Sequence, residues 1–215
     1  MTQVKICGLS EPETLETALE TGADFVGFIF YEPSPRNLPL ERARALGQQV
    51  GGRASKVAVT VDADDAMLER IVEALEPDYL QVHGSETPER VAELGARFGR
   101  PVIKSIKVRD ADDIAQAVRF GGAADMFLFD AKAPEDLANA LPGGNGVVFD
   151  WSLLGGDGDL PRFMLSGGLT VENIGHALEI TGAGIVDVSS GVESAPGVKD
   201  AGLIRKFIEA AKRAR

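Results

Sequence analysis

Residues 4–9 read Val-Lys-Ile-Cys-Gly-Leu, a short apolar strand pattern that ends in a thiol and a glycine before a helix start at Ser10. Cys7 is the only cysteine among 215 residues, so it forms no disulfide within the chain and no multi-thiolate metal site. A thiol at the end of a strand is a candidate nucleophile or proton acceptor. A free cysteine is also often a small buried side chain, so this stretch alone leaves both interpretations open.

The same order of strand then helix recurs along the chain. Short β-rich runs alternate with segments that carry Ala, Leu and Glu at helical spacing. Strands are predicted at 4–7, 25–30, 56–61, 79–82, 102–106, 126–129, 163–165 and 185–188. Helices are predicted at 11–21, 39–50, 64–75, 88–98, 111–120, 171–181 and 201–213. Ser10, Thr87 and Thr170 each precede a helical segment and are predicted to cap it.

Strands that are nearly all followed by helices predict a parallel sheet, and the lack of in/out alternation indicates strands buried on both faces. Their number and the chain length favour a closed (β/α)₈ TIM barrel over an open doubly wound sheet, which is the alternative. The unit between 130 and 161 is glycine-rich, with only a weak helical segment at 151–154. No repeat or linker divides the chain, so residues 1–215 are predicted to be one domain.

Composition limits the class of partner. A hydrophobic content of 44% is typical of a globular protein with a buried core. A formal charge of −11 and an isoelectric point near 4.7 argue against nucleic acids and anionic membranes, because both bind basic surfaces. Met1 leads directly into a strand pattern, and no apolar run has the length of a membrane span. We therefore expect a soluble, cytoplasmic protein.

Glycine and serine follow the last two predicted strands, where barrels of this kind bind phosphate. The two stretches are Gly167-Gly168 and Ser189-Ser190-Gly191. Glycine lets backbone amides approach phosphate oxygens closely, and a serine hydroxyl adds a donor. Tight turns use the same residues, but two such loops after adjacent strands favour a phosphorylated small molecule as ligand.

Chemistry-bearing side chains also follow the earlier strands. Asp130 ends an apolar run, where poor solvation would favour a protonated carboxyl that acts as an acid; a cap is the alternative. Together with Cys7, it could face a small substrate from a second direction. Arg36 could hold a carboxylate by two parallel hydrogen bonds or lie solvated at the surface. His83 is more often a structural hydrogen bonder than a catalyst, and with His176 in mid-helix no histidine metal site is expected.

A series of short motifs then runs the length of the chain. In order, they are Lys5-Ile6-Cys7-Gly8, Gly27-Phe28-Ile29-Phe30, Ser34-Pro35-Arg36, Gln81-Val82-His83-Gly84, Leu128-Phe129-Asp130, Gly143-Gly144, Phe149-Asp150-Trp151, Gly167-Gly168-Leu169 and Asp187-Val188-Ser189-Ser190-Gly191-Val192-Glu193. Their order and spacing resemble the phosphoribosylanthranilate isomerase family of tryptophan biosynthesis. The chain departs from that pattern at Asn145, where Thr or Ser is expected, at Ser166, where Ala is usual, and at Thr60-Val61-Asp62.

The resemblance implies a TIM barrel and an intramolecular oxidoreductase that needs neither cofactor nor metal. Its reaction would be the Amadori rearrangement of N-(5-phosphoribosyl)anthranilate to 1-(2-carboxyphenylamino)-1-deoxyribulose 5-phosphate. Cys7 matches the family's general base, Asp130 its general acid, and Arg36 the residue that holds the anthranilate carboxylate. The remaining substrate-binding positions are Gly167, Gly168, Asp187, Ser189, Ser190 and Gly191. A monomer or a homodimer is expected.

Two rival classes stay open. One is another phosphosugar barrel enzyme: a histidine-pathway isomerase would need two carboxylates where Cys7 and Asp130 lie, and an indole-glycerol-phosphate synthase a catalytic lysine. The other is a barrel that only binds a phosphoribosyl ligand. Turnover separates them, because a pure binder would be stabilised by its ligand and catalyse nothing.

Overall fold

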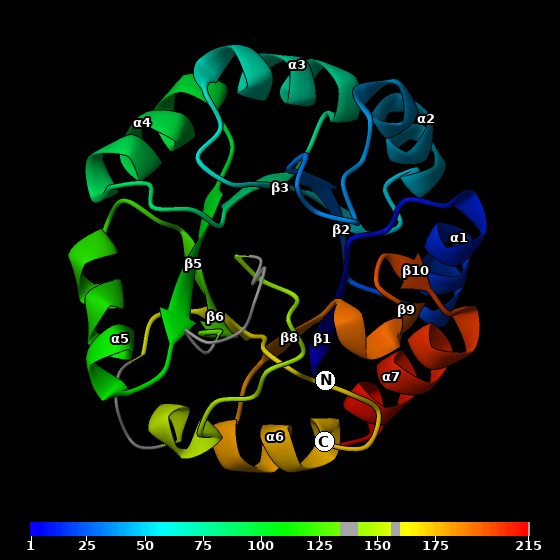
Figure 1. Cartoon of the computed structure of the whole chain (residues 1–215), viewed down its shortest axis with the longest axis vertical. Coiled ribbons are helices and arrows are strands. Elements are labelled where there is room, and N and C mark those ends of the chain that lie inside the picture. The colour runs from blue at the N-terminus through cyan, green and yellow to red at the C-terminus, as the bar shows by residue number, and fades with distance from the viewer. Residues whose placement is uncertain (134–141, 156–159, 215) are drawn as a thin grey trace.

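Eight parallel strands close into a barrel in the computed structural model, with helices around its outside (Figure 1). The structure describes residues 1–133, 142–155 and 160–214. Each strand pairs with the next along the chain, and β8 pairs with β1. The strands are β1 (Gln3–Cys7), β2 (Phe25–Phe30), β3 (Ser55–Thr60), β4 (Tyr79–Val82), β5 (Val102–Val108), β6 (Met126–Ala131), β7 (Phe163–Leu165) and β8 (Ile185–Val188). This order confirms the predicted TIM barrel and excludes the doubly wound sheet.

The helices follow the strands as predicted, with one irregular unit. They are α1 (Pro12–Thr21), α2 (Leu40–Val50), α3 (Asp65–Leu75), α4 (Pro88–Phe98), α5 (Ala111–Ala115), α6 (Ile174–Thr181) and α7 (Ala201–Arg213). Helix α5 continues as the 3₁₀-helix η1 (Gln116–Phe120), so the helix predicted at 111–120 is only partly α-helical. Between β6 and β7, the described residues form one short 3₁₀-helix, η2 (Trp151–Leu154).

Only one of the three predicted helix caps is confirmed. The Thr87 hydroxyl accepts the amide of Arg90 and caps α4. Helix α1 instead has Glu11 at its N-cap, with no side-chain cap, and Pro12 in its first turn. The Thr170 hydroxyl accepts the amide of Glu172 in a turn ahead of α6, so the caps predicted at Ser10 and Thr170 are wrong.

The barrel interior changes from apolar to polar along each strand. Alternate residues of a strand share a face, so Met126, Leu128 and Asp130 of β6 all point inward. A buried cluster of Phe25, Val57, Val59, Ile103, Met126, Leu128, Met164 and Ile185 fills this interior next to Cys7. The next inward positions are polar: Gln81, Asp130, Ser166 and Asp187. The apolar layer therefore closes one end of the barrel, and the polar groups gather at the carboxyl ends of the strands.

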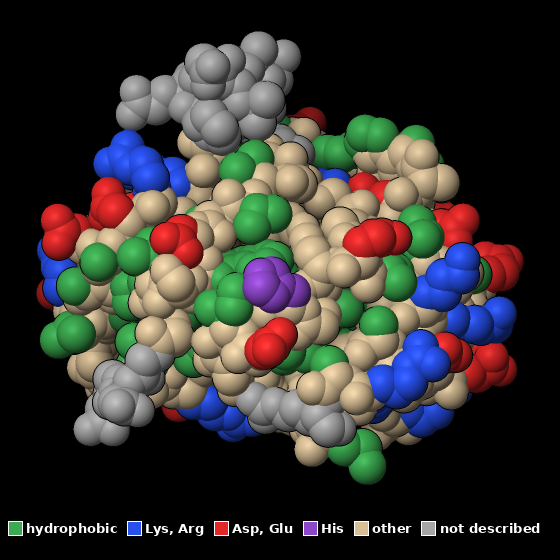
Figure 2. All heavy atoms as spheres, turned by 90° about the horizontal axis from the view of Figure 1, so that it is seen from below, with side chains coloured by type: hydrophobic (Ala, Val, Ile, Leu, Met, Phe, Trp, Pro, Cys, Tyr) green, Lys and Arg blue, Asp and Glu red, His purple; other side chains and the backbone are tan. Residues whose placement is uncertain are grey.

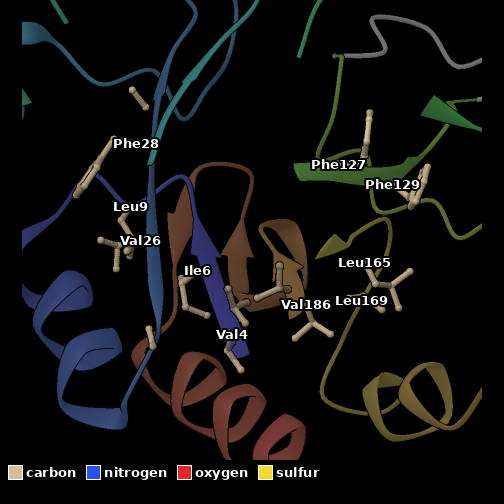
Figure 3. Close-up of a cluster of buried hydrophobic side chains, with 14 of the residues drawn as sticks. Val4, Ile6, Leu9, Val26, Phe28, Phe127, Phe129, Leu165, Leu169 and Val186 are labelled. Carbon is tan, nitrogen blue, oxygen red and sulfur yellow. The ribbon is translucent and has the colours of Figure 1, made fainter. Parts of the chain in front are cut away.

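A second apolar core lies between the sheet and the helices. The outward residues of the strands, such as Val4 and Ile6 of β1 and Val186 of β8, are fully buried against it. Figure 3 shows Val4, Ile6 and Val186 on the side of the sheet that α7 covers. Strands buried on both faces explain why the sequence showed no in/out alternation.

A small antiparallel hairpin lies outside the barrel after β8. It follows the 3₁₀-helix η3 (Ser190–Val192) and consists of β9 (Glu193–Ala195) and β10 (Val198–Lys199). The sequence patterns did not predict it. The hairpin holds the buried ion pair of Glu193 and Lys199.

The outer surface carries both signs of charge. On the face shown in Figure 2, Lys and Arg side chains of the described residues lie among Asp and Glu side chains and form no continuous basic patch. Within residues 1–133, 142–155 and 160–214, no helix is both long and apolar enough to cross a membrane.

Candidate active site

A single pocket at the carboxyl ends of the strands contains every site residue predicted from the sequence. Cys7, Arg36, Asp130, Gly167, Gly168, Asp187, Ser189, Ser190 and Gly191 all line it. Gln81, His83, Asn145 and Ser166 line it as well. The strand ends and the loops after them are where TIM-barrel enzymes place their chemistry.

Cys7 is buried at the end of β1, with its sulfur against the bare backbone of Gly27 on β2. A Cβ on Gly27 would lie 3.0 Å from Cys7 Sγ, so a larger residue there would displace the thiol. Burial raises the pKa of the Cys7 thiol, while the ammonium groups of Lys5 and Lys199 act to lower it. The thiol therefore lies in an apolar cluster, with the basic side chains of Lys5 and Lys199 close to it.

Asp130 is the penultimate residue of β6, and its carboxyl faces His83 after β4. Asp130 Oδ2 lies 3.4 Å from His83 Nε2, which is long for a hydrogen bond. Gln81 Nε2 lies 3.2 Å from His83 Nδ1. With the Gln81 amide donating to Nδ1, the ring carries its hydrogen on Nε2, facing the Asp130 carboxyl. A Cβ on Gly143 would lie 2.7 Å from the ring and 2.8 Å from the carboxyl, so this glycine lets the loop close over both groups.

Arg36 is buried in the loop after β2 and paired with Glu193. Its Nε and Nη2 donate to the two carboxylate oxygens of Glu193 at 2.7 and 2.8 Å, and Nη2 also contacts the Gly144 carbonyl. Among the described residues, Nη1 has no hydrogen-bond partner. Arg36 can therefore offer a ligand one edge of its guanidinium while Glu193 fixes the other.

Lys199 joins the same cluster. Its ammonium donates to Glu193 at 2.7 Å and to the Ser189 carbonyl at 2.9 Å. Burial acts to raise the pKa of Glu193, but the hydrogen bonds from Arg36 and Lys199 outweigh it, and that pKa lies below its ordinary value. Two basic groups share one carboxylate, although burial lowers the pKa of Lys199 below its ordinary value.

The two glycine-serine loops have open backbone donors. Gly167 and Gly168 adopt φ of 88° and 62°, which L side chains disfavour. Within the described part of the chain, the amides of Gly167, Gly168 and Ser190 donate to no partner. A Cβ on Gly191 would lie 1.9 Å from the Leu169 carbonyl oxygen, so the two loops pack together without room for a side chain. Together they present N–H groups to an anion.

The Ser189 hydroxyl is already used within the protein. It donates to the Cys7 carbonyl at 3.1 Å and lies 3.2 Å from Lys199 Nζ. Ser189 can therefore serve a phosphate through its backbone, and its side chain links the loop to β1.

Comparison with known proteins decides the family. Residues 4–210 match the family model described as N-(5'phosphoribosyl)anthranilate (PRA) isomerase. The chain belongs to this family. It is 55% identical over 212 residues to the N-(5'-phosphoribosyl)anthranilate isomerase of Parvibaculum lavamentivorans, covering 99% of each chain. It is 58% identical to that of Nitrobacter winogradskyi, covering 98% of this chain and 93% of the relative.

Solved structures agree in fold. The phosphoribosyl anthranilate isomerase of Thermotoga maritima superposes with a TM-score of 0.88 at 35% identity, covering 99% of both chains. A second isomerase structure, with a TM-score of 0.85 at 33% identity and the same coverage, was solved in complex with reduced 1-(o-carboxyphenylamino)-1-deoxyribulose 5-phosphate. The Thermotoga maritima isomerase is also described as dimeric, in a structure of monomers generated from it.

The sequence patterns did not assign roles to several charged groups that lie behind the pocket lining of this isomerase family member. Glu193 and Lys199 come from the unpredicted hairpin. Lys5 was visible two residues before Cys7, and strand periodicity would have placed it on the same face. Asp150, which also follows the sixth strand, lies outside the pocket lining and caps η2: its carboxylate accepts the amide and the hydroxyl of Ser152, and these bonds lower its pKa.

Proposed function

We propose that this pocket catalyses the Amadori rearrangement of N-(5-phosphoribosyl)anthranilate to 1-(2-carboxyphenylamino)-1-deoxyribulose 5-phosphate in tryptophan biosynthesis. The observation that carries the proposal is the match to the isomerase family over residues 4–210, in a barrel that has Cys7 and Asp130 in one pocket. The reaction is an aldose–ketose isomerisation that moves protons and electron pairs within one molecule. It therefore needs no cofactor.

Asp130 is the proposed general acid. It gives its proton to the ribose ring oxygen, the C1′–O bond breaks, and the anthranilate nitrogen supplies the electron pair that forms a C1′=N⁺ iminium. The Nε2–H of His83 faces the resulting carboxylate and stabilises its negative charge. His83 therefore helps to position Asp130 and compensates the negative charge that Asp130 acquires when it gives up its proton.

Cys7 is the proposed general base. Its thiolate removes the proton from C2′, which the adjacent iminium acidifies, and the C2′–H electrons form a C1′=C2′ bond that neutralises the nitrogen. The enolamine then becomes the ketone by losing the C2′ hydroxyl proton and gaining a proton at C1′. Cys7 and Asp130 lie at the carboxyl ends of strands β1 and β6, which are not adjacent in the ring, so they can act on two separate substrate atoms.

Substrate binding is proposed to use Arg36 and the two glycine-serine loops. The open Nη1 edge of Arg36 is proposed to hold the anthranilate carboxylate, with Glu193 and Lys199 behind it. The loops at 167–168 and 189–191 are proposed to bind the phosphate, mainly through backbone amides, and Asp187 to lie along the substrate between them. This supports a small phosphorylated molecule as the ligand.

Gly168→Val is expected to raise KM about tenfold or more with a smaller change in kcat. The φ of Gly168 is 62°, and a Cβ there would lie 2.5 Å from Val148 Cγ2, so the phosphate loop must shift. The matched control is Gly52→Val, a positive-φ glycine with open space around it and outside the pocket lining. An unchanged KM in folded Gly168→Val protein would contradict the proposal that this loop binds the phosphate.

The activity itself is tested with freshly prepared N-(5-phosphoribosyl)anthranilate. The loss of substrate fluorescence is followed while an excess of the next enzyme of the biosynthetic pathway consumes the product. Turnover by the unmodified chain is expected. Ligand-dependent stabilisation without turnover would favour a binding protein, and turnover of a different phosphosugar alone would favour another barrel enzyme.

The remaining proposals concern organisation. One domain over residues 1–215 is supported by the closed barrel and by α7, which packs against both α1 and β1. We propose a cytoplasmic enzyme, which agrees with a biosynthetic role, and cell fractionation tests this location. The expected monomer or homodimer is tested by sedimentation of the purified chain.

A further inference from the structure

Lys5 is a buried cation that the proposed catalytic steps do not use. It lies on β1 two residues before Cys7, so both side chains point into the barrel. Its side chain is fully buried and lies below the pocket lining. An ammonium group taken out of water is costly unless it is paired, so its partners indicate its purpose.

The partners of Lys5 are the Asp187 carboxylate and the Cys7 thiol. Lys5 Nζ donates to Asp187 Oδ1 at 2.7 Å, and the other oxygen of Asp187 accepts the Ser166 hydroxyl at 3.0 Å. Burial acts to lower the pKa of Lys5, but Asp187 and Cys7 more than offset it, and the pKa lies above its ordinary value. Lys5 therefore stays charged at the bottom of the pocket.

The absence of a side chain at Gly27 leaves room for the Lys5 ammonium near the Cys7 sulfur. A Cβ on Gly27 would lie 3.1 Å from Lys5 Nζ and 3.0 Å from Cys7 Sγ. The ammonium and the thiol therefore both lie over the same bare backbone. Lys5 has three N–H donors, and Asp187 occupies one of them with its carboxylate. The ammonium can therefore hold Asp187 and donate to a thiolate in the same geometry.

We propose that Lys5 is a positioning residue for the proposed base, and that its ammonium, anchored by Asp187, stabilises the thiolate of Cys7. This inference rests on the proposed function only for its catalytic consequence; the effect on the thiol is separate. A buried thiol needs a nearby cation to ionise near neutral pH, and the Lys5 ammonium lies over the same bare backbone of Gly27 as the Cys7 sulfur.

Other charged groups of the described residues also lie near Cys7. Asp187 on β8 opposes ionisation of the thiol, and Lys199 on β10 favours it. Arg36 lines the same pocket from the loop after β2. His83 and Asp130 line the same pocket from β4 and β6. Removal of Lys5 leaves Asp187 without its counter-ion beside the sulfur, so the pKa of Cys7 should rise further.

The test measures ionisation of the thiol directly, because Cys7 is the only cysteine of the chain. The rate of alkylation by iodoacetamide and the ultraviolet absorbance of the thiolate are followed against pH in Lys5→Met. Alkylation at neutral pH should fall at least about tenfold and recover as the pH rises. The value of kcat/KM should show the same displacement toward higher pH, whereas a merely structural defect would lower it at every pH.

Ser166→Ala is the matched control, because it removes a neutral hydrogen bond from the same Asp187 carboxylate and leaves Lys5 in place. Its alkylation profile should match that of the unmodified protein. If Lys5→Met does not fold, Lys5→Met combined with Asp187→Asn removes both buried charges, and alkylation should still require a higher pH because the thiolate lacks the ammonium beside it.

An unchanged alkylation profile in either folded Lys5 variant would overturn the inference. That result leaves the proposed function intact if Cys7→Ala is inactive. Conversely, a displaced profile combined with full activity of Cys7→Ala would support the effect of Lys5 on the thiol and remove the proposed base.

Discussion

Cys7→Ala is expected to lower kcat at least about a hundredfold, with a smaller change in KM. The proposed reaction needs a proton acceptor at C2′, and the sulfur is the group that β1 brings to the pocket. Alanine keeps the small apolar volume against Gly27 and removes the acceptor. Steady-state kinetics with freshly prepared N-(5-phosphoribosyl)anthranilate measure both constants.

Cys7→Ser serves as the companion variant and should fail as well. A serine hydroxyl is far too weak an acid to ionise beside Lys5, so it supplies no base. Circular dichroism and ligand-dependent stabilisation establish that both variants fold and bind. A near-normal kcat in folded Cys7→Ala would refute the thiolate base and direct attention to Asp187, which lines the same pocket.

Asp130→Asn is also expected to lower kcat at least about a hundredfold while KM changes less. The amide has nearly the shape of the carboxyl and can still meet His83, but it has no acidic proton for the ring oxygen. Asp150→Asn is the matched control, because Asp150 is an exposed aspartate that caps η2 outside the pocket lining. Substantial turnover by folded Asp130→Asn, or an equal loss in Asp150→Asn, would contradict the assignment of the acid.

The fold was largely predictable because each strand of the barrel is buried on both faces. Such strands appear as short apolar runs bounded by turns, and the helices between them have a different period. The predicted strand at 56–61 shows the limit of this method: β3 ends at Thr60, and Asp62 already adopts a positive φ of 47°. The caps at Ser10 and Thr170 failed because a preceding hydroxyl does not show where the first turn begins.

The candidate site was predictable as a set of positions, because the carboxyl ends of parallel strands meet at one face. Its internal connections were not. The pairing of Arg36 with Glu193 depends on the hairpin of β9 and β10, whose strands are too short to leave a periodic pattern. The ionic contacts of Lys5 depend on the register of β1 against β8, which places Lys5 opposite Asp187.

In the proposed mechanism, Cys7 and Asp130 approach different atoms of one bound substrate. A crystal structure of this chain with a non-reactive reduced analogue of the product measures this most directly. We expect Cys7 Sγ to lie nearest C2′, the Asp130 carboxyl to lie nearest the oxygen derived from the ribose ring, and the loops at 167–168 and 189–191 to hold the phosphate. An analogue bound with its phosphate elsewhere, or with Cys7 and Asp130 both remote from those atoms, would contradict this mechanism.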